Sequence, residues 1–68
     1  MRSVFRETLG LRVKVERTKL RLKQSELATL AGVSQADVSQ LERDRKLGAA
    51  RRRPILAALG INDGSDVR

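Results

Sequence analysis

The sequence predicts an all-α domain of four to five short helices. Apolar residues recur at the three- and four-residue spacing of amphipathic helices along most of the chain. The chain has 68 residues with one Phe, no Trp and no Tyr, so we expect a small core of Leu, Val, Ile and Ala. This length allows one domain, which we assign to residues 1–68.

The N-terminal part predicts one full helix after a short extension. Residues 1–8 form the extension, and a helix that begins between Ser3 and Thr8 would use Phe5 as an early core contact. A disordered basic arm is the alternative. The full helix is expected over residues 9–20. Its core side is expected to hold Leu9, Val13 and Leu20, flanked by Leu11 and Val15.

Residues 24–43 predict two short helices joined by a tight turn. Gly32 would end the first helix, because glycine adopts the left-handed conformation without a Cβ penalty. Ser34 would cap the second helix, with Asp37 completing a capping box. Lys23 stands where a Ser, Thr or Asn cap is expected. The missing capping hydrogen bond lowers the stability of the helix by about 1 kcal/mol. The buried face of the first helix is expected to hold Leu27, Ala28 and Ala31, widened by Leu30.

The second helix of this pair has two different faces. Val38 and Leu41 form its buried side at helical spacing. Small and amide side chains, with one cation, form the opposite arc. These are Gln35, Ala36, Ser39, Gln40 and Arg43. Amides pair bidentately with an adenine edge, and an alanine leaves room for a thymine methyl. A helix in the DNA major groove needs such a face; a solvated face on an ordinary helical hairpin is the other interpretation.

A last helix is expected over residues 49–59. Pro54 is tolerated only in a first turn, so the regular part should start at Arg52 or Arg53. Gly60 would end the helix. Its apolar stripe is Ile55, Leu56 and Leu59, followed by Ile61 beyond the glycine. Residues 62–68 are rich in Gly, Asp and Ser and are expected to fray.

Charge and composition limit the classes of function that the chain could have. Lys and Arg number 15 against 8 Asp and Glu, and a net charge of +7 on a short chain favours a polyanionic partner. Without Cys or His, the chain lacks thiolate chemistry and the commonest general base and metal ligand. We therefore expect no enzyme, cofactor or metal site. Since there is no apolar run of about 20 residues, we expect no membrane span and a cytoplasmic, nucleoid-associated protein.

One ungapped stretch resembles the helix-turn-helix of the phage repressor and Cro (XRE-like) family. It reads Gln24-x-x-Leu27-Ala28-x-x-Ala31-Gly32-Val33-Ser34-x-x-x-Val38-Ser39-x-x-Glu42. The resemblance implies a lambda-repressor-like domain of four to five helices with its helix-turn-helix at about residues 24–43. It also implies that the second helix enters a DNA groove.

The residue types and the resemblance together predict roles for individual residues. The expected base readers are Gln35, Ala36, Ser39 and Gln40. The expected phosphate contacts are Gln24, Lys23, Ser34, Arg43, Arg45, Lys46, Arg51, Arg52 and Arg53. Arg17 and Glu42 are implied to form a structural ion pair, and Gln24 to hydrogen-bond Gln35. Asp37 is expected to cap its helix rather than accept from cytosine N4. The family's Asn-Gly after Glu42 is replaced here by residues 43–46, where Asp44 is expected to turn the loop.

The resulting hypothesis is a transcriptional repressor that binds a palindromic operator in double-stranded DNA as a homodimer. It would act by occluding polymerase, without a small-molecule ligand. The family uses a fifth helix in dimerisation, and from the composition of residues 62–68 we expect this helix to be absent or reduced to one turn. The alternative is an antitoxin or small adaptor that uses the same fold to bind protein, which a neighbouring toxin gene would favour.

Overall fold

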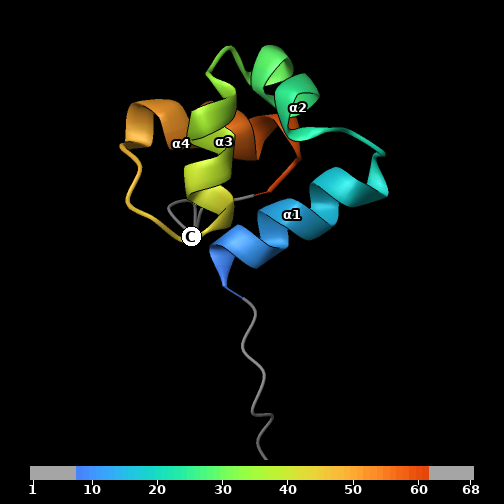
Figure 1. The fold of residues 1–68 in the computed structure, drawn as a ribbon, viewed down its shortest axis with the longest axis horizontal. Helices are drawn as coiled ribbons and strands as arrows, with labels where there is room; N and C mark the ends of the chain where they lie inside the picture. The colour runs from blue at the N-terminus through green and yellow to red at the C-terminus, as the bar shows by residue number, and fades with distance from the viewer. Residues whose placement is uncertain (1–7, 62–68) are drawn as a thin grey trace, which may run out of the picture.

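The computed structural model describes residues 8–61, which form four helices and no strand (Figure 1). The helices are α1 (Leu9–Lys19), α2 (Gln24–Ala31), α3 (Gln35–Glu42) and α4 (Ala49–Ala58). The expectation of an all-α fold is thereby confirmed. The predictions for Phe5, for a helix start before Thr8 and for the tail at 62–68 lie outside the described residues.

The third helix is the centre of the arrangement, because α3 contacts each of the other three helices. In Figure 1, α3 runs down the middle of the molecule, with α2 above it, α4 passing behind it and α1 crossing near its lower end. The end of α3 therefore lies beside the start of α1. None of the four helices is long and apolar enough to cross a membrane.

The core lies between α3 and the inner sides of the other helices. Its buried members are Val13, Leu27, Ala28, Val38, Leu41, Ile55, Leu56 and Ile61. Three leucines that were expected inside are exposed. Leu30, Leu20 and Leu9 expose 65%, 56% and 37% of their surface. Leu30 lies on the flank of α2, since Leu27 and Ala28 fill the contact with the neighbouring helices. Leu20 follows the last residue of α1, so the helical spacing no longer orients it.

The expected caps of the α2–α3 pair are present. Gly32 ends α2 with φ 73°, and the Ser34 hydroxyl accepts from the Asp37 N–H while Asp37 accepts from the Ser34 N–H. Lys23 provides no side-chain cap for α2. Its own N–H instead donates to the Glu26 carboxylate at 2.7 Å, so half of a capping box remains.

Two helices end on residues other than glycine in the left-handed conformation. Arg21 after α1 and Asp44 after α3 both have φ 59°. In each case the N–H of this residue and the N–H of the next residue donate to carbonyls of the last helical turn, the pattern of a Schellman motif. Asp tolerates this conformation better than most residues. Asp44 thus stands in for the glycine that the family resemblance led us to expect at the end of the helix.

The start of α4 differs from the expectation. The helix begins at Ala49, and Pro54 lies inside it rather than in its first turn. The N–H groups of Arg51 and Arg52 both donate to the Gly48 carbonyl, so helical bonding is established before the proline. Arg52 also donates to the Leu47 carbonyl at 3.5 Å. Because burial of Ile55 and other α4 side chains holds the rest of the helix, a missing hydrogen bond at Pro54 is tolerated.

Candidate nucleic-acid interface

The outer face of α3 is an exposed surface on a fixed helix. Four residues of this face are exposed, and a fifth, Ser39, is half-buried. The four are Gln35, Ala36, Gln40 and Arg43. Val38 and Leu41 on the opposite side are buried in the core, so the helix cannot rotate without exposing them. The expected base readers therefore share one outward face.

The connection between α3 and α4 returns alongside this face (Figure 1). The Gln40 side-chain nitrogen donates to the Lys46 carbonyl at 3.2 Å. An amide has two N–H donors and one carbonyl acceptor, so this bond leaves Gln40 able to pair with a further group. The bond restricts the orientation of the amide and joins it to the cationic loop.

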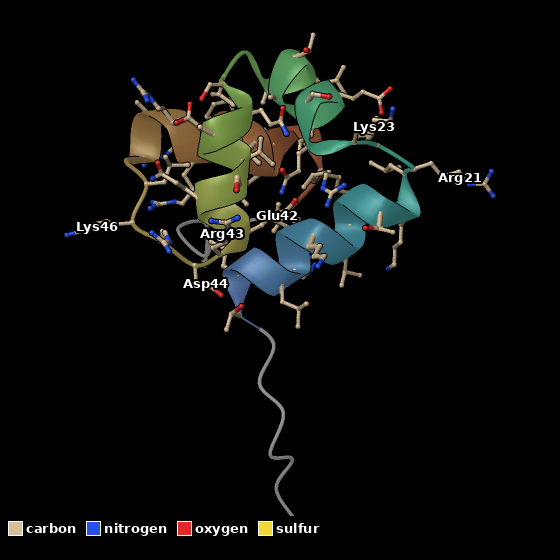
Figure 2. The ribbon with its side chains drawn as sticks, in the orientation of Figure 1. Arg21, Lys23, Glu42, Arg43, Asp44 and Lys46 are labelled. Atoms are coloured by element: carbon tan, nitrogen blue, oxygen red, sulfur yellow. The ribbon has the colours of Figure 1, made fainter. Side chains whose placement is uncertain are left out.

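Cations lie on both sides of α3. Figure 2 places Lys46 at one side of the helix and Lys23 at the other, each extended away from the protein. Arg43, Arg45, Lys46 and Lys23 are all exposed. An exposed polar face between two cationic edges matches a duplex groove, whose base edges lie between two phosphate backbones.

A buried ion pair joins α1 to the end of α3. The Arg17 Nε donates to Glu42 Oε2 at 2.6 Å, and its Nη2 donates to Oε1 at 3.2 Å. The two side chains are only 14% and 5% exposed. Arg17 also donates to the Leu22 carbonyl at 2.7 Å, so one guanidinium links α1, the α1–α2 connection and α3.

Gln24 belongs to the same network. Its side-chain nitrogen donates to Glu42 Oε1 at 3.1 Å, whereas the family resemblance implied a bond to Gln35. The difference follows from proximity, because the start of α2 meets the end of α3, where Glu42 already accepts from Arg17. Gln24 is half-buried at the N-terminus of α2, whose backbone N–H groups still suit an anion.

Asp37 is a buried charged residue in the first turn of α3. One carboxylate oxygen accepts from the Ser34 N–H at 3.1 Å, and the other accepts from Arg51 Nη1 at 3.2 Å. The hydrogen bond from the Ser34 backbone, aided by the Ser34 hydroxyl and the Arg51 charge, lowers the pKa of Asp37 below its ordinary 3.8 despite its burial. With both oxygens occupied, Asp37 acts as a cap and an ion-pair partner.

This lowered pKa predicts a loss of stability in acid. Because the folded protein holds Asp37 ionised, its stabilisation is present above the unfolded pKa of 3.8 and is lost as the pH falls through the lower folded pKa. We expect the melting temperature of the parent to fall as the pH is lowered from about 5 to about 2. The Asp37→Asn variant should fall less over the same range in a thermal melt followed by circular dichroism. Parallel curves for the two proteins would contradict this assignment.

The sequence predicted that Asp44 turns the loop, but it predicted neither the contacts of Asp44 with the start of α1 nor the role of Gly10. The Asp44 carboxylate accepts from the Thr8 hydroxyl at 2.7 Å and from the Gly10 N–H at 2.9 Å, so it ties the cationic loop to the start of α1. A Cβ on Gly10 would lie 2.5 Å from the Leu41 carbonyl oxygen. The available signal was a glycine inside a predicted helix, which indicates close backbone approach.

The three arginines of α4 have separate surroundings. Arg51 pairs with Asp37, and Arg52 is half-buried with a bond to the Leu47 carbonyl. Arg53 is exposed. The three side chains therefore have different surroundings, and their contact with phosphate stays a prediction. Ser34 is exposed at the start of α3, and its hydroxyl accepts from the Asp37 N–H.

Comparisons with known proteins find no match, either among the models of protein families or among curated proteins. Within residues 8–61, no group of three or more Asp, Glu, His or Cys side chains is placed to hold a metal ion.

Proposed function

We propose that this chain is a sequence-specific DNA-binding protein of the helix-turn-helix class, with α3 as the recognition helix. The observation that carries the proposal is the exposed face of α3, held outward by the buried Val38 and Leu41 and flanked by cations. In this role Gln35, Ala36, Ser39 and Gln40 read base edges. The mechanism is binding alone, without a catalytic step or a cofactor.

The proposed phosphate contacts set the register of the helix in the groove. Arg43, Arg45 and Lys46 would hold one backbone, and Lys23 with the N-terminus of α2 would hold the other. A single helix reads only a few base pairs. We therefore propose a homodimer on a two-fold symmetric operator, acting as a repressor that occludes polymerase.

Footprinting on the DNA upstream of its own gene, together with selection of duplexes from a random pool, tests this function. We expect one enriched sequence with two symmetric half-sites about one helical turn apart. A protected region of the same sequence should appear in the footprint. Uniform binding of all sequences, or no binding at low salt, would reject the proposed function.

The Gln35→Ala variant tests base reading. We expect a loss of about 1–3 kcal/mol on the selected site, because a bidentate contact to one base is removed. Binding to random duplex should change little. The matched control is Arg43→Ala, which should weaken binding to both duplexes equally and lower the salt slope by about one. Fluorescence anisotropy across a salt series measures both, and equal losses for Gln35→Ala on the two duplexes would exclude base reading.

A further inference from the structure

We infer that Asp37 is a positioning residue for DNA binding, which holds the Arg51 guanidinium beside the start of α3 so that it contacts a phosphate. This inference rests on the proposed function. It assigns to a buried carboxylate on the recognition helix an effect on affinity that acts through an arginine of α4.

The ion pair has one buried and one exposed member. The Asp37 side chain is 8% exposed and the Arg51 side chain is 66% exposed. Asp37 is held in place by its bond to the Ser34 N–H, so it is a rigid anchor. Arg51 is joined to that anchor through Nη1, at 3.2 Å from Oδ1. The exposed Arg51 side chain is thus held by the buried, hydrogen-bonded Asp37 carboxylate.

The pair lies at the edge of the proposed DNA face. A surface hollow of about 380 Å³ separates the α2–α3 turn from the first turns of α4, and Ser34, Asp37 and Arg51 line it. Ser34 and Asp37 belong to the end of α3 that would enter the groove. Arg51 therefore stands where a backbone phosphate would pass a helix inserted by its N-terminal end.

The guanidinium has donors beyond those that Asp37 uses. Its five N–H groups form a planar fork, and one nitrogen faces the carboxylate. The remaining donors suit a phosphate oxygen, to which arginine binds in a directional way. Asp37 would reduce the conformational freedom that Arg51 loses on binding, which is how preorganisation raises affinity.

Simple electrostatics predicts the opposite effect for Asp37. A carboxylate near phosphates repels them, so its removal alone would tighten binding. If Asp37 instead orients Arg51, then Asp37→Asn should weaken binding although it removes a negative charge. The sign of the change in affinity therefore separates the two roles.

The test measures anisotropy of the selected duplex over a salt series for the parent, Asp37→Asn, Arg51→Ala and the double variant. We expect Asp37→Asn and Arg51→Ala each to weaken binding about 3- to 10-fold and to lower the salt slope by about one. In the Arg51→Ala background, Asp37→Asn should cause no further loss. A less stable cap would reduce the active fraction without changing the slope, so the slope distinguishes positioning from folding.

Glu16→Gln is the matched control. It also removes one negative charge, but Glu16 pairs on α1 with Arg12 and Lys19, neither of which is a proposed DNA contact. We expect its affinity to be unchanged or higher, with the parent slope. Equal or tighter binding by Asp37→Asn, or an unchanged slope, would overturn the positioning role while leaving the proposed function intact. Failure of the parent protein to bind any duplex would overturn both.

Discussion

Replacement of Glu42 by alanine should lower the free energy of unfolding by about 3 kcal/mol. The carboxylate accepts two bonds from Arg17 and one from Gln24, and it is almost fully buried. Its removal leaves the Arg17 guanidinium, which is 14% exposed, without its charge partner. The cost therefore comes mainly from an uncompensated cation in the interior rather than from the loss of attraction. Urea denaturation followed by circular dichroism measures it.

Two further variants give this prediction its controls. Glu16→Ala removes the same side chain from exposed pairs with Arg12 and Lys19, and it should cost less than about 1 kcal/mol. Glu42→Gln keeps the shape and one acceptor but not the charge, so its loss should fall between those of the two alanine variants. Similar losses of unfolding free energy for Glu42→Ala and Glu16→Ala would show that burial does not raise the cost of breaking the ion pair.

Gly10→Ala is expected to have the second largest effect, a destabilisation of about 2–3 kcal/mol. The added Cβ would lie 2.5 Å from the Leu41 carbonyl oxygen, 2.6 Å from that of Glu42 and 2.8 Å from the Asp44 carboxylate. Two of these neighbours are backbone atoms at the end of α3, so α1 must move away. Alanine gains about 1 kcal/mol of helix propensity over glycine, which makes a net loss diagnostic of the close contact.

Gly48→Ala is the matched control for the glycine. A Cβ on Gly48 meets nothing within 4 Å, and its φ of −60° is open to any residue. We expect a change of less than about 1 kcal/mol, since only the preference at the helix start is altered. Thermal melts of the two variants, run beside the parent, make the comparison. A Gly10→Ala protein as stable as Gly48→Ala would mean that α1 and α3 are not in close contact.

The α2–α3 pair is the part of the fold that sequence reasoning predicted best. Its start and stop signals are local, because a glycine in the left-handed conformation and a Ser–Asp capping box act within a few residues. The burial of Val38 and Leu41 follows from helical spacing in the same way. The outward face of α3 was predictable for that reason, since it is what the buried side leaves exposed.

Contacts between distant segments were not predictable from such signals. The bonds from Thr8 and Gly10 to Asp44 cross more than thirty residues of sequence. The bond from Gln24 to Glu42 and the pair of Asp37 with Arg51 likewise depend on how the helices pack. Apolar spacing alone also overestimated the buried surface of α1 and α2. It shows that residues share a side without showing how far the partner helix extends.

The bonds of Asp44 have a consequence for how far this protein can be dissected. Apart from Arg51, the side chains proposed to meet a duplex all lie between Lys23 and Lys46. That segment therefore looks suitable for transplanting into another scaffold. The bend that orients its last cations, however, is held by Thr8 and Gly10 at the far end of the chain. A graft without the first helix would carry the side chains but not the shape of their loop, so the smallest transferable module includes α1.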